Sequence, residues 1–328
     1  NIYMEQSAVR DGVTAEEVKG ILLGMASGQE TLLGYFRRFI RNFEKRVGIN
    51  RTVGSLRAYS NAYSHIERFL QAQYKLSDIP FSALDRSFID KYDLYLRTER
   101  NLAPGTIINL TVQLKTIVGE AIADGIITAS PFMGYEPVRP KHVQKYLTAE
   151  ELHRIMTTPL HRQPLYHVRD MFLFSCFTGI PYGDMRLLTK DNLCLAEDGI
   201  WWIKSARQKT KIEFEIPLLD LPLQILKKYS GTAPGDKLLP MYCNSTLNLY
   251  LKEIARICHI DRPLVFHAGR HTYATEITLS HGVPLETVSR MLGHSQIETT
   301  QIYAKVTDEK IDADTKALNR KISERFSV

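Results

Sequence analysis

The sequence predicts a mainly α-helical protein with two domains and one small antiparallel β-sheet in the second domain. Apolar residues recur at helical spacing in long stretches on both sides of a proline-rich break around Pro137 and Pro140. Two short strand-like stretches flank a basic turn after this break. With 328 residues, the chain is long enough for two domains that each bury a hydrophobic core.

Four amphipathic helices are expected before the break, and their short connections predict a small bundle. The first carries Phe36, Phe39 and Phe43 on one face, and Gly48 marks its end. We place the bundle at residues 30–136 and interpret the less patterned residues 1–29 as the trailing part of an upstream region. The expected helices are Thr31–Val47, one that opens after Thr52, Asp85–Thr98 and Pro104–Asp124.

The break is interpreted as a connector at residues 137–145. Two prolines so close together stiffen the chain into an extended segment, and Lys141 adds positive charge to it. Helix resumes at Thr148, which forms a capping-box pattern with Glu151 three residues later. The second domain is therefore placed at residues 146–328.

The second domain combines the predicted sheet with further helices. Strands are expected at Gly199–Lys204 and Ile212–Ile216, joined by a basic hairpin at Arg207–Lys211. Ser295 is a candidate N-cap for the helix that leads to Tyr303. The expected helices are Leu221–Tyr229, Ser245–His259, Phe266–His281, Pro284–Leu292, Ser295–Tyr303 and a terminal stretch, Asp308–Phe326.

Composition indicates a water-soluble globular protein, with 44% hydrophobic and 24% charged residues. The longest apolar run, around Met171–Phe177, is far too short to cross a bilayer, so no membrane partner is expected. The four cysteines show no paired spacing, which is typical of reduced thiols in a cytoplasmic protein. The net charge of +6 favours a polyanionic partner without identifying it.

Residues that could carry chemistry gather in the last third of the chain. His267 and Arg270 share one helix face, and Gly293-His294 follows about twenty residues later. Tyr303 stands nine residues after His294. Lys209 lies in the basic hairpin, from which it could reach the same pocket. A hairpin lysine is more often a solvated charge, so its role depends on the rest of the pattern.

Such a set of side chains suits the transesterification of a DNA phosphodiester. The five-coordinate phosphorus of the transition state carries extra negative charge, which preorganised cations and hydrogen-bond donors stabilise. Arginine can hold two phosphate oxygens at once. A phenol with a pKa of about 10 needs electrostatic help to lose its proton. This scheme requires no metal and no cofactor.

The order of Lys209, His267-x-x-Arg270, Gly293-His294 and Tyr303 resembles the catalytic signature of the tyrosine recombinase, or phage integrase, family. The resemblance implies a SAM-like core-site-binding bundle followed by the DNA breaking-rejoining enzyme fold. It also implies that His267, Arg270 and His294 hold the scissile phosphate and that Lys209 is the general acid. Tyr303 would be the nucleophile that forms a 3′-phosphotyrosyl link. The upstream region would then be an arm-binding domain.

One position departs from the family pattern. The family places a first catalytic arginine in a Thr-Gly-Leu-Arg-like turn, whereas here Thr178-Gly179-Ile180 is followed by Pro181. The turn is similar to that of conjugative-transposon integrases in which this arginine is also replaced. We expect a nearby arginine to fill the gap, with Arg186 as the first candidate and Arg169 and Arg207 as weaker ones.

Double-stranded DNA is the partner that the resemblance implies, with a dimer on each site, a tetramer in the synapse, and accessory DNA-bending or excision factors. The terminal stretch is expected to pack on a neighbouring protomer. The candidate phosphate contacts carry no base specificity. They lie on the polar face of the first helix, in the hairpin and in the connector: Arg37, Arg38, Arg41, Lys45, Arg207, Lys211 and Lys141.

Three alternatives stay open. A type IB topoisomerase-like enzyme would use the same chemistry to relax supercoils. The proline at position 181 could instead mark a catalytically impaired DNA-binding or architectural protein. A phosphodiesterase could use His267 and His294 with water as the nucleophile. His271, four residues after His267, lacks the glutamate of a zinc-protease helix and is more often a packed residue.

Overall fold

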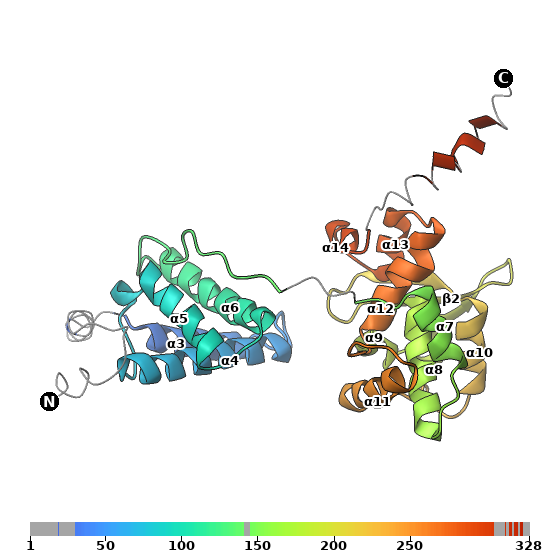
Figure 1. Cartoon of the computed structure of the whole chain (residues 1–328), viewed down its shortest axis with the longest axis horizontal. Coiled ribbons are helices and arrows are strands. Elements are labelled where there is room, and N and C mark those ends of the chain that lie inside the picture. Colours follow the sequence, from blue (N-terminus) through green and yellow to red (C-terminus); the bar gives the residue numbers. More distant parts are fainter. Residues whose placement is uncertain are drawn as a thin grey trace. The chain divides into compact units, whose positions relative to one another are not determined.

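The computed structural model describes residues 19, 30–140, 145–304, 312, 315–316, 318–320 and 322–323. Contacts divide the chain into two compact units, Asn1–His142 and Val143–Val328 (Figure 1). The division falls within the segment that the sequence marks as a connector. Within the described residues, no helix has the length and apolar character that a membrane span needs.

All four helices expected in the first unit are present (Figure 1). They are α3 (Leu32–Glu44), α4 (Val53–Phe69), α5 (Arg86–Thr98) and α6 (Pro104–Ala123). A π-helical turn, η1 (Leu70–Tyr74), extends α4, and a 3₁₀ turn, η2 (Phe81–Ala83), precedes α5.

Local signals explain where these helices begin. The Thr52 side chain accepts a hydrogen bond from the Ser55 amide at 3.1 Å, and the Asp85 carboxylate accepts one from the Phe88 amide at 2.7 Å. Each cap satisfies a backbone donor that the first helical turn leaves unpaired. The apolar faces then meet in one core in which Phe36 and Phe69 are fully buried.

The second unit is built around α8 (Gln163–Thr178), which packs against α10 (Asp220–Lys228), α11 (Asn244–Ile257) and α12 (Ala268–Thr272). Neighbours on several sides explain why α8 is apolar nearly all round, including the run Met171–Phe177. α7 (Ala149–Thr157) opens the unit with the predicted capping box between Thr148 and Glu151.

The sheet has three antiparallel strands in the order β1 (Leu193–Leu195), β2 (Trp201–Ala206) and β3 (Glu213–Pro217). The two longer strands lie close to the predicted ranges, and the basic hairpin joins them. β1 was not predicted, because three residues are too few to show a period. Two short helices, α9 (Tyr182–Met185) and η3 (Lys190–Asn192), come before it.

Two helical predictions near the C-terminus need correction. The expected helix Phe266–His281 consists of α12, the π-helical η4 (Tyr273–Thr278) and the 3₁₀ turn η5 (Leu279–His281). The expected helix Ser295–Tyr303 shrinks to α14 (Glu298–Gln301), capped by Ile297, so Ser295 is not its cap. α13 (Leu285–Leu292) is as expected, and Asp308–Phe326 lies largely outside the described residues.

Candidate active site

A cavity of about 940 Å³ opens in the second unit where the hairpin, α12 and the segments around α14 come together. Its lining includes five of the six residues predicted to be catalytic: Lys209, His267, Arg270, His294 and Tyr303. The structure therefore brings together side chains up to 94 positions apart (209 to 303) in one cavity. Arg186, the sixth, does not line it.

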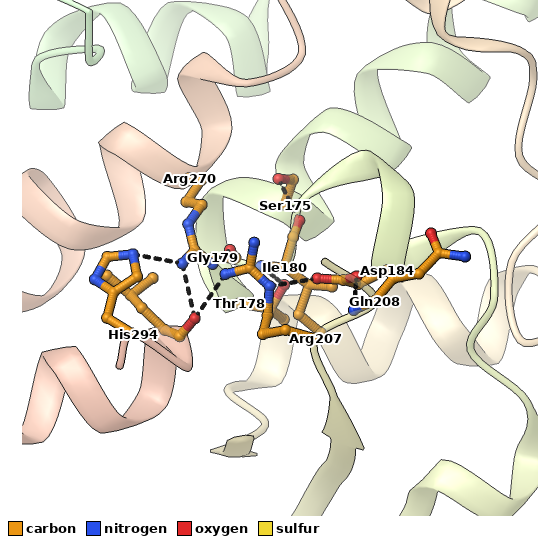
Figure 2. A network of polar contacts seen from close by, with 10 residues as sticks. Ser175, Thr178, Gly179, Ile180, Asp184, Arg207, Gln208, Arg270 and His294 are labelled. Atoms are coloured by element: carbon orange, nitrogen blue, oxygen red, sulfur yellow. Dashed lines mark hydrogen bonds and ion pairs between the residues drawn. The ribbon is translucent and has the colours of Figure 1, made fainter. Parts of the chain in front are cut away.

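Arg270 is the centre of the polar network (Figure 2). Its guanidinium, only 3% exposed, donates hydrogen bonds to the Gly179 carbonyl at 2.9 Å and the Leu292 carbonyl at 2.7 Å. Burial, and then the charge of Arg207, lower the pKa of Arg270 to about 10. It therefore stays charged at neutral pH, and its fixed hydrogen bonds hold its fork in one orientation.

His294 is fixed in one neutral tautomer. Its Nε2 lies 2.8 Å from Arg270 Nη2, which can only donate, so Nε2 accepts and Nδ1 carries the proton. Nδ1 then donates to the hydroxyl of the fully buried Thr300 at 2.8 Å. Burial, and then the charges of Arg270 and Arg207, lower the pKa of His294 to about 4.

Tyr303 lies inside the cavity of its own chain and is only 7% exposed. Its ring packs in a small apolar cluster with Tyr273 and Leu292. It stands parallel to the His294 ring at 6.4 Å and edge-to-face with His271 at 5.2 Å. Burial raises the pKa of the phenol, and the nearby Arg270 opposes that rise. The guanidinium of Arg270 is thus a group that favours ionisation of this hydroxyl.

His267 and Lys209 occupy opposite kinds of environment. Burial, followed by the charges of Arg270 and Arg207, lowers the pKa of His267, and its ring meets His271 edge-on at 4.8 Å. Lys209 is exposed at the tip of the hairpin and borders the cavity without an acidic partner among the described residues. A neutral imidazole can donate or accept, whereas a free ammonium can give up a proton.

Arg186, the first candidate for the missing arginine, is wrongly placed for that role. It is exposed at the C-cap of α9 and does not border the cavity. Arg207, a weaker candidate for the missing arginine, lines the cavity instead. Its Nη1 donates to the Leu292 carbonyl at 2.9 Å, the same oxygen that accepts from Arg270 (Figure 2). Two guanidinium groups therefore lie side by side.

Asp184 holds Arg207 in this position. Its Oδ2 lies 2.6 Å from Arg207 Nε, and its Oδ1 accepts a hydrogen bond from the Gln208 amide at 2.9 Å. Both partners are nearly buried, with side chains 6% and 15% exposed. No local pattern indicates this pair, because its members stand 23 positions apart (184 to 207).

The predicted DNA contacts lie in different surroundings. On α3, Arg37 donates to the Tyr63 hydroxyl at 2.6 Å and Arg38 pairs with Glu30 at 2.9 Å, whereas Arg41 and Lys45 are exposed without partners among the described residues. In the hairpin, Lys211 is exposed but does not border the cavity. Lys141 lies outside the described residues.

Residues 145–310 match the phage integrase family, and residues 31–137 match the phage integrase SAM-like domain. The chain belongs to the phage integrase family. The described fold and the cavity agree with this membership, which makes the chain a tyrosine site-specific recombinase. The two matched ranges together cover nearly all of the chain outside residues 1–30 and the C-terminal end.

The chain is similar to several tyrosine recombinases named XerD. That of Listeria monocytogenes serovar 1/2a is 26% identical over 273 residues, which cover 78% of this chain and 89% of the relative. That of Staphylococcus saprophyticus is 26% identical over 297 residues, covering 86% and 96%. This chain therefore spans most of the length of these recombinases.

Solved integrase structures share the fold. The Tn1549 transposon integrase in complex with transposon right end DNA has a TM-score of 0.68 at 18% identity, over 91% of this chain and all of that one. A lambda integrase dimer bound to a COC′ core site has a TM-score of 0.68 at 18% identity, over 85% of this chain and all of that one.

Proposed function

We propose that this recombinase integrates or excises a mobile DNA element by cutting and rejoining duplex DNA through a covalent link at Tyr303. One observation carries the proposal. The ring of Tyr303 lies in the same cavity as Arg270 and His294 of its own chain. Among the described residues, that cavity is lined by cations and by no acidic side chain.

The reaction follows from the positions of these groups. The Tyr303 hydroxyl gives its proton to solvent water, its oxygen attacks the phosphorus of one DNA strand, and the bond to the 5′ oxygen breaks. Lys209 gives a proton to that leaving oxygen, which leaves as a 5′ hydroxyl. Arg270 and His267 stabilise the charge on the non-bridging oxygens, and His294, whose Nε2 accepts from Arg270, holds that guanidinium in position. The 3′-phosphotyrosyl bond keeps the energy of the phosphodiester, so a 5′ hydroxyl from another strand can reverse the step.

Arg207 takes the place of the arginine that is absent at position 181. Its guanidinium shares an acceptor with Arg270, so both forks border the same volume. Asp184 lies against the Nε atom of Arg207, and Nη2 has no partner within the described part of the chain. A second preorganised cation at the phosphate is the contribution that the usual arginine would make.

The partner is double-stranded DNA, bound by a dimer at each site and by a tetramer during exchange. Similar structures are a lambda integrase dimer bound to a core site and a lambda integrase tetramer bound to a Holliday junction, both with TM-scores above 0.6. The net charge of +6 and the exposed cations Arg41 and Lys45 on α3 favour a polyanion. Accessory DNA-bending or excision factors would act on the same assembly.

A suicide duplex tests this proposal. The junction formed by the two ends of the element that carries the gene is prepared with a nick beside the cleavage point, so that the cut fragment diffuses away. The parent protein accumulates a covalent protein–DNA adduct, and Tyr303→Phe gives none. Binding of the duplex by both proteins without any adduct would indicate an architectural protein instead.

The same DNA separates two further alternatives. A two-site assay with supercoiled plasmids yields recombined products for a recombinase, whereas relaxation without partner exchange would identify a topoisomerase-like enzyme. Free hydrolysed ends that persist in Tyr303→Phe would identify a phosphodiesterase based on His267 and His294.

A further inference from the structure

The charges around the active-site cavity are of two kinds. Three arginines are held by internal partners: Arg207 by Asp184, Arg262 by Glu151, and Arg270 by two backbone carbonyls. Two lysines at the rim, Lys145 and Lys209, have no acidic partner within the part of the chain that the structure describes. Lys209 belongs to the reaction already described. Lys145 has no part in it.

Lys145 stands on a segment that is fixed to the catalytic elements. The next two residues are tied down: the Tyr146 carbonyl accepts from Arg262 Nη2 at 2.7 Å, and the Leu147 amide donates to the Thr272 hydroxyl at 3.0 Å. Leu147 and Thr272 are fully buried. Since Thr272 follows Arg270 on α12, this segment is anchored to the helix that carries the phosphate-binding arginine.

A second tie reinforces the first. Arg262 also forms a two-pronged ion pair with Glu151, with both Nη–Oε distances at 2.5 Å, and Glu151 completes the capping box at Thr148. The backbone directly after Lys145 is therefore held in place before any ligand arrives. A side chain on an ordered backbone loses less conformational entropy when it binds a ligand.

Lys145 borders the active-site cavity. It belongs to the lining, and its positive charge is one of those that lower the pKa of both His267 and His271. These two imidazoles form the wall beside Tyr303. An exposed ammonium beside neutral imidazoles suits a bound anion, and no acidic side chain among the described residues of the lining competes for it.

We infer that Lys145 binds a DNA backbone phosphate at the mouth of the active site, next to the phosphate that Tyr303 attacks. This inference rests on the proposed DNA function of the same cavity. Lys145 comes directly before the anchored residues Tyr146 and Leu147. A phosphate contact at Lys145 would therefore hold the first residues of the catalytic unit against the DNA backbone. Lys145 is then a binding residue at the same cavity as the hairpin lysine, and it takes no part in proton transfer.

The salt dependence of DNA binding tests this inference, because each phosphate contact contributes a fixed slope. Loss of one contact lowers the slope of log affinity against log salt by about 0.9. When the salt concentration rises from about 50 to about 200 mM, both proteins lose affinity for the suicide duplex. The factor by which Lys145→Ala loses affinity should be about 3.5-fold smaller than the factor for the parent. Lys145→Arg, which keeps the charge, should restore the parental slope.

Lys227→Ala is the matched control, since Lys227 is also exposed and unpaired among the described residues but lies on α10, outside the cavity lining. It should keep the parental slope. At saturating protein, Lys145→Ala should still form the Tyr303 adduct, which separates a failure of this inference from a failure of the proposed function. An unchanged slope in Lys145→Ala, or an equal loss in Lys227→Ala, would overturn the inference.

Discussion

Arg207 is the residue whose role changes most between sequence and structure. As a member of a basic hairpin it has the ordinary explanation of a solvated charge. In the structure its side chain is only 15% exposed, Asp184 holds one edge of it, and Leu292 links it to Arg270. With proline at position 181, the guanidinium that lies beside Arg270 thus comes from the hairpin between β2 and β3 instead of the turn after α8.

Removal of Arg207 should therefore slow the chemical step. Arg207→Ala is expected to form the covalent adduct about 10²–10³-fold more slowly than the parent at saturating protein, since one charge-stabilising donor is lost from the transition state. Arg186→Ala, an exposed control, should stay within about 2-fold of the parent. The measurement is single-turnover adduct formation on the suicide duplex. Equal rates for both variants would contradict the assignment.

The buried imidazoles predict how stability changes with pH. The pKa values of His271 and His294 are about 4, below the ordinary value of 6.5, so between these values the unfolded chain binds more protons than the folded one. Stability should therefore fall as the pH drops from about 6.5 towards 4, with the loss complete below both values.

Melting temperatures at about pH 7 and about pH 5 check this expectation, because the window lies between the folded and unfolded pKa values. Between these two pH values, the melting temperature of the double variant His271→Asn/His294→Asn should fall by less than that of the parent. The comparison uses the difference within each protein, so a general destabilisation of the variant does not affect it. Identical differences in the two proteins would show that other groups control the acid response.

At the scale of elements, the turn after α8 places the carbonyl that orients Arg270. Gly179 adopts φ +69°, where a side chain is strained, and a Cβ there would overlap the Tyr273 ring and come within 2.9 Å of Leu292. The Gly179 carbonyl accepts from Arg270. The glycine is thus required both by backbone conformation and by the close approach of η4.

Gly179→Ala should destabilise the catalytic unit by about 3 kcal/mol or more, from left-handed strain plus overpacking. Gly231→Ala is the matched control, because Gly231 has φ +76° with open space around it, so only the strain of about 1 kcal/mol applies. Denaturant unfolding measures both. A Gly179→Ala variant as stable as Gly231→Ala would show that the Tyr273 contact is unimportant.

Which elements the sequence could predict follows from the length of each pattern. The bundle helices have 13 to 20 residues with apolar faces, and two of them have side-chain caps, so periodicity identifies them. β1 and α14 have three and four residues, too few to show a period, and the π-helical η4 keeps helical composition while changing its register.

The candidate site was predictable where a local motif, or the order of motifs along the chain, indicates it. His267 with Arg270, and His294 with Tyr303, are close in sequence and have a chemical reason to lie together. The ion pair of Asp184 with Arg207 and the anchoring of Tyr146 by Arg262 join residues 23 and 116 positions apart, and only the folded chain brings them together.

At the scale of the whole molecule, the C-terminal stretch is proposed to bind a neighbouring protomer. Deletion of Asp308–Val328 should then weaken synapsis of two sites far more than binding to one site, because only the paired complex needs contacts between protomers. Gel-shift titration of single duplexes and of paired duplexes measures the two separately. An equal loss in both would instead indicate a direct contribution to DNA binding.

The most direct measurement of the central claim is the identity of the bond between protein and DNA. After reaction with the suicide duplex, the adduct is digested with protease and nuclease and the linked peptide is sequenced by mass spectrometry. The account predicts a peptide that carries a nucleotide 3′-phosphate on the Tyr303 oxygen, with a free 5′ hydroxyl on the released strand. A link through any other residue, or a phosphate left on the 5′ end, would contradict it.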